Sequence, residues 1–508
     1  MKRRDFLAST LVGGSLLSMP AFLHAAKAAG ALADVPDNPF MTWFGVDEAI
    51  IRKVMKELAA NGADDAELYF EHSRTNALQM EDRIISSAVS SIEQGVGLRV
   101  VIGDQTGFAF TEDLSLNAML NAARTAAAIA RGGGASVPQH FNPQKQGDLY
   151  NIKVPWSDVG IDQKLPLITR LEAMAQQADP AIQKVRVNWG DNEQRVMIAT
   201  LDGRIVTDYR PMTRLWCSLT ASKNGEVQSN SSNLAARAGL GFYTDERLKS
   251  LVDQAVERTM VLFDARRPPA GEMPVVLAAG ASGILLHEAI GHGMEADFNR
   301  KGTSIYSDML TKKVAEPFVT VVDQGTLPHE RGAINYDDEG NPSQHNVLVQ
   351  NGILKSYLQD NISARHYKIK PTGSGRRESY KHNPMPRMTC TFMEDGPHSK
   401  GEMIASMKKG IIAETYTNGQ VQIGAGDFTF YIKNGWLVEN GKVTAPIKDC
   451  NIIGNGPEVL KRITMVAADG KLDTGGWTCG KNGQSVPVSQ GMPSVLVSRM
   501  TVGGEHVS

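Results

Sequence analysis

A double proline, Pro268–Pro269, ends a helical pattern near the middle of the chain and precedes an apolar run typical of a strand. Proline lacks a backbone N–H, and the residue before it avoids helical backbone, so no regular element is expected to continue through this pair. At about 150 residues per domain, a chain of 508 residues should hold two or three domains. We therefore predict an N-terminal domain at residues 36–264, a linker at 265–272 and a C-terminal domain at 273–508.

The segment before the prolines mixes helical and strand-like patterns. Strand-like alternation covers residues 67–70, 77–80 and 95–102, and more strands are expected between Val185 and Thr220. Apolar residues at helical spacing predict helices over residues 46–62, 114–131, about 163–177 and 244–263.

The segment after the prolines is rich in Asn–Gly pairs flanked by apolar alternation. Asn–Gly supplies the positive φ angles that tight hairpin turns need, and the run Phe428–Val443 predicts two successive hairpins. The predicted class is α+β, with a mixed N-terminal α/β half and a strand-rich C-terminal half. The pairs lie at residues 351–352, 418–419, 434–435, 440–441 and 482–483.

Composition excludes several classes of protein. A net charge of −2 offers no basic surface for nucleic acid, so no nucleic-acid partner is expected. Beyond residue 30 no stretch supplies the roughly 18 uncharged apolar residues of a membrane span, so the mature chain is expected to be soluble. Four cysteines without a CxxC pair rule out a disulfide scaffold. Whether Cys217, Cys390 and Cys450 pair is left open.

The first 28 residues resemble an export signal. Arg3–Arg4 is followed by a weakly apolar run and then by small residues around Ala26–Lys27–Ala28, a pattern typical of a twin-arginine (Tat) signal peptide. We expect export by the Tat pathway to the periplasm or another extracytoplasmic space. The alternative is an uncleaved N-terminal anchor. Because the Tat route moves folded proteins, a metal could be bound before export.

The segment His287–Glu288–Ala289–Ile290–Gly291–His292 predicts a metal site. Two imidazoles close in sequence commonly begin a zinc site, and a neighbouring carboxylate can act as the base on a zinc-bound water. Five residues of separation place the two rings about 140° apart on a regular α-helix, against about 40° for a separation of four. We therefore expect a π-type turn, or a helix that ends at Gly291.

A catalytic zinc needs a third protein ligand and an open position for water. Glu295 and Asp297 are nearby candidates, and Cys479 in a glycine-rich segment is a distant one. The residues alone do not choose among these three. Two unrelated histidines on a buried helix are the alternative to any metal site.

The segment from His287 to Asp297 resembles the HEAxGHxxExD signature of TldD-type metallopeptidases of the TldD/PmbA family. The resemblance is dense from about residue 271 to the end of the chain and looser before it. Further segments that resemble the family are 323–328, 337–340, 375–380, 383–389, 453–457, 479–481 and 501–504.

This resemblance implies one zinc per catalytic subunit, held by His287, His292 and Cys479, with Glu288 as the base. It implies Glu-assisted attack of a metal-bound water on peptide bonds of unstructured peptides or peptide leaders. Glu295 and Asp297 become candidates for orienting a ligand. The resemblance further implies a C-terminal domain of curved sheets that carries the metal site.

The resemblance also implies a partner, a PmbA/TldE-like subunit in a heterodimer, with a homo-oligomer as the alternative. No membrane contact is expected after the signal is removed. Two other functions are kept open: a non-catalytic PmbA/TldE-like subunit, and a structural-zinc scaffold in an exported complex. Intact His287, Glu288, His292 and Cys479 favour the peptidase.

Overall fold

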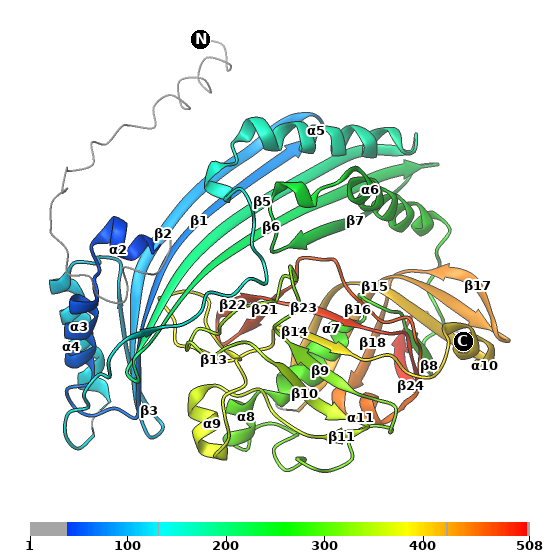
Figure 1. The fold of residues 1–508 in the computed structure, drawn as a ribbon. Helices are drawn as coiled ribbons and strands as arrows, with labels where there is room; N and C mark the ends of the chain where they lie inside the picture. The colour runs from blue at the N-terminus through cyan, green and yellow to red at the C-terminus, as the bar shows by residue number, and fades with distance from the viewer. Residues whose placement is uncertain (1–37, 131, 423–424, 505–508) are drawn as a thin grey trace, which may run out of the picture.

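The computed structural model describes residues 38–130, 132–422 and 425–504. The proposed signal, residues 1–28, lies outside them. One long curved sheet from the N-terminal half arches over a strand-rich C-terminal half (Figure 1). None of the helices in these ranges has the length and apolar character that crossing a membrane would require. The mixed α+β class is confirmed.

The N-terminal sheet is built from long antiparallel strands in the order β3-β2-β1-β5-β6, with β7 and the short β4 on β6. Side chains of β1 alternate between the two faces, as a strand requires. The even-numbered Leu68 and Phe70 pack among helices, and the odd-numbered Glu67, Tyr69 and Glu71 face the C-terminal half. The bounds are β1 Asp65–Glu81, β2 Ile84–Ile102, β3 Gln105–Thr111, β4 Asn142–Pro143, β5 Ile182–Thr200, β6 Arg204–Lys223 and β7 Glu226–Ala236.

Helices cover one face of this sheet. The four predicted helices are confirmed as α3, α4, α5 and α6. Three of them are shorter than predicted, and α5 begins two residues before its predicted start. The helices α3 and α4 form one core with the end of the sheet where β1 and β6 begin and β2 and β5 end. The helices α5 and α6 form another core with Trp156 and Trp189. The bounds are α2 Pro39–Phe44, α3 Glu48–Leu58, α4 Leu116–Ile129, α5 Ile161–Gln177 and α6 Asp245–Met260.

The C-terminal half contains two larger sheets that share one core. One has the order β15-β8-β24-β18-β16-β17, with β19 on β24, and the other has the order β11-β10-β9-β14-β23-β20. Strand β8 begins at Gly271, so the last two residues of the expected linker lie in a strand. The strands of the first sheet are β8 Gly271–Leu277, β15 Lys409–Gln422, β16 Asp427–Glu439, β17 Lys442–Ile447, β18 Cys450–Asn455, β19 Ile463–Val466 and β24 Val495–Gly503.

Short elements complete this half. The helix α7 lies against β14 and β23 and leads into the histidine segment. The second sheet comprises β9 Val321–Gln324, β10 His345–Gln350, β11 Ile353–Leu354, β14 Cys390–Met393, β20 Lys471–Leu472 and β23 Ser489–Met492. The remaining elements are α7 Gly283–Leu286, α8 Ala296–Arg300, α9 Asn361–Tyr367, α10 Lys400–Ser406, α11 Gly456–Lys461, β12 Gly375–Arg376, β13 Met385–Pro386, β21 Thr478–Lys481 and β22 Gln484–Pro487.

The prediction of two hairpins within Phe428–Val443 is wrong in part. Asn440–Gly441 is the turn between β16 and β17, but Asn434–Gly435 lies inside β16. Asn434 is buried, where its side chain accepts from Thr415 and Asn230 and donates to the carbonyl of Arg258. This pair therefore serves long-range contacts instead of a turn. Asn418–Gly419 likewise lies inside β15, whereas 351–352 and 482–483 are turns.

Candidate metal centre

A π-helical turn, His287–Gly291, follows α7 and brings the two histidines to one side. The N–H of His292 donates to the carbonyl of His287, the i to i+5 bond that defines this turn. The two rings lie 5.2 Å apart between centroids and are nearly perpendicular, at 84°. The expected π-type widening is confirmed, and it removes the obstacle that a spacing of five poses on a regular helix.

The third side chain arrives from a hairpin nearly two hundred residues later. Asn482 and Gly483 both have positive φ, 50° and 75°, and turn β21 into β22. Cys479 and Lys481 are two residues apart on β21, so both point to the same buried side. Arg387 is buried beside the hairpin and donates to the carbonyl of Cys479 and to that of Gln484, which holds the hairpin in place.

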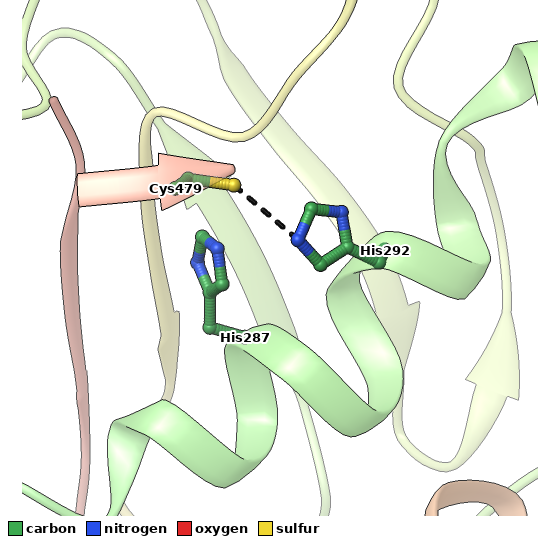
Figure 2. A group of neighbouring side chains, drawn as sticks. All are labelled: His287, His292 and Cys479. Carbon is green, nitrogen blue, oxygen red and sulfur yellow. Dashed lines mark hydrogen bonds between the residues drawn. The ribbon is translucent and has the colours of Figure 1, made fainter. Parts of the chain in front are cut away.

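The three candidate ligands converge. Cys479 Sγ lies 3.3 Å from His292 Nε2, and one ligand atom each from His287, His292 and Cys479 lies within 4.8 Å of the others (Figure 2). All three side chains are 1% exposed. Cys479, the distant candidate, is thus the one that the fold brings to the two rings.

The donor set fits a zinc ion. Both ring nitrogens of His287 are buried and have no hydrogen-bond partner among the described residues. Burying a polar nitrogen without a partner is costly, and coordination of a cation would satisfy one of the two. Two imidazoles and one thiolate favour zinc over magnesium or calcium.

Electrostatics keep the thiol in its charged form. Burial by itself would raise the pKa of Cys479, but the adjacent rings of His287 and His292 outweigh burial and lower it well below the usual value. Burial likewise disfavours charged His292, while Glu295 and Cys479 raise its pKa well above the usual value. A thiolate is the form of cysteine that binds metals.

Glu295 and Lys481 hold His292 in orientation. Glu295 Oε2 lies 2.9 Å from His292 Nδ1, which leaves Nε2 to face Cys479. Lys481 Nζ lies 3.0 Å from Glu295 and 2.8 Å from Asp297. Burial raises the pKa of Glu295, but Lys481 and His292 bring it down to about 2. Asp297 pairs with Lys481, and among the described residues it forms no hydrogen bond or ion pair with either histidine.

Glu288 is the acidic side chain that water reaches at this site. Its carboxylate lies 3.7 Å from His292 Nε2, and its side chain is 28% exposed, against 1% for His292. Lys481 and Arg387 support the site, and neither role was predicted from the sequence. The signal for Lys481 was its spacing of two from Cys479, which predicts the same face of a strand.

Family models of three PmbA/TldA metallopeptidase domains match the chain. Domain 1 matches residues 66–130, the central domain residues 154–263, and the C-terminal domain residues 270–504. These ranges contain His287, His292 and Cys479 in the C-terminal match.

Curated relatives match over nearly the full length. The metalloprotease TldD homolog of Haemophilus influenzae is 38% identical over 92% of this chain and 99% of the relative. The zinc metalloprotease TldD homolog of Saccharolobus solfataricus is 26% identical over 89% of this chain and 99% of the relative. The crystal structure of TldE from Thermococcus kodakarensis has a TM-score of 0.70 and 18% identity, covering 90% of this chain and 99% of that one, and it shows the same fold.

Proposed function

This chain belongs to the PmbA/TldA metallopeptidase family, and on that premise we propose that it is a zinc-dependent enzyme that hydrolyses peptide bonds in unstructured peptides or peptide leaders. The observation that carries the zinc assignment is the convergence of His287, His292 and Cys479 around two unpartnered ring nitrogens. A relative named as a zinc metalloprotease supports the same metal.

The three ligands would hold one zinc, which supplies a water of lowered pKa and polarises the scissile carbonyl. Glu288, exposed to water beside His292, takes the proton from the attacking water and returns it to the leaving amine. Glu295 fixes which nitrogen of His292 faces the ion, and Lys481 keeps Glu295 charged in its buried position.

Replacing Glu288 by Gln tests the catalytic role. We expect Glu288→Gln to lower the rate of peptide hydrolysis by about 10²–10⁴-fold, since the general base is lost, while the zinc content stays near one per chain. The matched control is Glu257→Gln, a glutamate on α6 of the N-terminal half. Full activity in Glu288→Gln with bound zinc would contradict the catalytic role and favour a structural zinc.

Replacing Cys479 by Ser tests the ligand set. The neutral hydroxyl is a poorer zinc ligand than a thiolate, so zinc measured by elemental analysis should fall well below one per chain. Cys217→Ser is the control, because Cys217 is buried in the N-terminal core. Unchanged zinc in Cys479→Ser would remove the cysteine from the ligand set.

We also propose that the subunit pairs with a TldE-like subunit and is exported through the Tat pathway. The fold shared with TldE supports the first proposal, and the Arg3–Arg4 pattern supports the second. Native mass of the chain co-expressed with a TldE-like protein tests the pairing, and monomers alone would contradict it.

Cell fractionation of an Arg3→Lys/Arg4→Lys variant tests export. An unchanged distribution of the protein between the fractions would contradict the proposal.

A further inference from the structure

A cavity of about 430 Å³ lies between the N-terminal sheet and the β21–β22 hairpin. Its sheet side consists of residues on the face that is free of helices, including Ser73, Thr75 and Ser91. Its other side includes Thr478 of the hairpin. Because Thr478 is the neighbour of Cys479 and points to the opposite side of β21, one strand separates the cavity from the metal centre.

The cavity contains a buried guanidinium that has no anionic partner among the described residues. Arg237 lines the cavity and is 3% exposed, and its Nε has no hydrogen-bond partner among the described residues. Its guanidinium lies over the ring of Tyr150, 5.1 Å from the centroid, and no carboxylate of the described residues lies within 4.0 Å of it. The carboxylate that acts on its charge, Asp208, already accepts from Arg210 and Tyr150.

A second guanidinium lines the same cavity. Arg331 donates through Nε to the carbonyl of Trp477 at 2.9 Å and through Nη2 to Thr478 Oγ1 at 3.2 Å. These acceptors are neutral, and Nη1 has no partner among the described residues. Burial, together with the nearby Arg214, Arg237 and Arg376, lowers the pKa of Arg331 to about 9.

The two arginines are held together by the backbone. The N–H of Arg237 donates to the carbonyl of His329 at 2.9 Å, and His329 Nδ1 lies 3.1 Å from the carbonyl of Arg237. Arg331 follows two residues after His329. The charge of Arg237 disfavours the charge of Arg331 in the same cavity, and an anion bound there would relieve this repulsion.

The acidic residues that line the cavity do not neutralise Arg237 and Arg331. Glu378 accepts from the N–H of Ser485, and Glu71 accepts from Gln194 and Tyr380. Glu93 lies 4.0 Å from Lys381. Each therefore has a donor of its own, and none of the three lies within ion-pair distance of Arg237 or Arg331.

We propose that this cavity is a substrate subsite in which Arg237 and Arg331 bind a carboxylate of the peptide being cleaved. Guanidinium groups bind carboxylates through short charge-assisted hydrogen bonds, and the free Nη1 of Arg331 and the guanidinium of Arg237 supply the donors. The subsite rests on the proposed peptidase function. It makes the enzyme selective for peptides with a carboxylate at one position relative to the scissile bond.

Paired peptides test the subsite. Each pair has one sequence with a free or an amidated C-terminus, and a second series exchanges Asp for Asn at each position in turn. One pair should show a kcat/KM at least tenfold higher for the charged peptide, and the series tells whether a terminal or a side-chain carboxylate is bound. In Arg331→Gln that ratio should fall to about one. Arg186→Gln, an arginine of β5 outside the cavity, is the matched control and should keep the ratio.

Binding gives a second readout without turnover. Fluorescence anisotropy of a labelled peptide on the zinc-loaded Glu288→Gln variant should show the same tenfold preference, which Arg331→Gln added to it should remove. No preference in any pair, or a preference that survives Arg331→Gln, would overturn the subsite. If acetate stabilised the wild type against unfolding while no peptide pair showed a preference for the charged peptide, the subsite would be overturned too, because the site would then hold only a free anion. Failure of every peptide to be cleaved would instead contradict the peptidase.

Discussion

At the scale of single residues, the proposed metal centre depends on side chains other than its proposed ligands. His287, His292 and Cys479 would supply the donor atoms, but the orientation of His292 comes from Glu295 and the charge of Glu295 from Lys481. A buried histidine whose second nitrogen is fixed by a carboxylate has a defined tautomer and a fixed ring. Loss of that carboxylate should therefore weaken metal binding without removing a ligand.

We predict that Glu295→Gln lowers the affinity for zinc by about 10–100-fold, the usual cost of losing a partner that orients a ligand. Competition with a chromogenic chelator measures this affinity. Asp297→Asn is the control, because Asp297 contacts Lys481 and neither histidine. Equal affinities for Glu295→Gln and the wild type would show that His292 needs no such support.

Glu71 makes stability depend on pH. Burial raises its pKa to about 7, although Gln194 and the N–H of Tyr380 both donate to it. The native state therefore holds the proton more tightly than the unfolded state, in which the pKa is about 4.5. Its stabilising contribution is complete below about pH 4.5 and is lost as the pH rises through about 7. At 1.36 kcal/mol per pKa unit this loss is on the order of 3 kcal/mol.

We predict that Glu71→Gln flattens this dependence, because a neutral amide has no charge to bury, although its one oxygen can accept from only one of the two donors. Near pH 4.5 the variant should therefore be less stable to urea than the wild type by about 1 kcal/mol, and its stability relative to the wild type should rise by on the order of 3 kcal/mol as the pH passes 7. Urea unfolding at several pH values measures the difference. Parallel curves for the two proteins would place the pH dependence in other groups.

At the scale of elements, a π-turn and a hairpin meet at the site, and the sequence predicts them to different degrees. The spacing of five between His287 and His292 excludes a regular helix if both rings are to meet, so geometry predicts either a π-turn or a helix that ends at Gly291, and the structure has the π-turn. The arrival of Cys479 does not follow, because no local pattern tells which of three candidates lies near the rings. Cys479 was identified through the resemblance to the family. Only the packing of the β21–β22 hairpin brings its sulfur to the two rings.

Asn–Gly pairs show the same limit. At 440–441 and 482–483 the local preference for positive φ decides, and the pairs form turns. At Asn434–Gly435 tertiary contacts prevail, since a Cβ on Gly435 would lie 2.4 Å from the carbonyl of Ile412. A local signal thus predicts a turn only where no long-range contact needs the same two residues.

Gly291 in the π-turn is required by packing. A Cβ at this position would lie 2.2 Å from the sulfur of Met388, whose side chain is fully buried. We predict that Gly291→Ala costs about 1–3 kcal/mol of stability, as overpacking does, and displaces His292 enough to lower zinc affinity. Urea unfolding and chelator competition measure the two effects.

Space restored at Met388 should relieve this strain. The free energy of unfolding of the double variant Gly291→Ala/Met388→Ala should be higher, by about 1 kcal/mol or more, than the value obtained by adding the losses of the two single variants. Additive costs would mean that Gly291 is needed for its backbone and not for the space it leaves.

At the scale of the whole molecule, buried charges join the two halves. Arg99 of β2 lies 2.6 Å from Glu67 of β1 and 2.5 Å from Glu339 of the C-terminal half, and Arg377 lies 2.7 Å from the same Glu67. These residues stand up to 310 positions apart. Single charged residues at such separations carry no pattern, so the sequence predicts two domains but not the contacts between them.

Tyr380 adds a steric contact to these charges. Its ring and backbone lie against β2 where Gly95 and Gly97 leave space, since a Cβ at either position would lie within 2.4 Å of Tyr380. The cavity beside Arg237 is bounded by both halves, so its shape depends on how firmly they are joined.

We predict that Arg99→Met destabilises the protein by about 3 kcal/mol, because it leaves Glu339 without its partner and Glu67 with Arg377 alone in a dry interface. Urea unfolding at neutral pH measures the loss, which should be nearly the same at low and high salt since buried pairs are poorly screened. Arg124→Met is the matched control: its pair with Glu57 is 57% and 36% exposed and should cost under about 1 kcal/mol. If Arg99→Met cost no more than this control, the halves would be held by apolar packing and Tyr380, and the charges would serve only to fix their relative position.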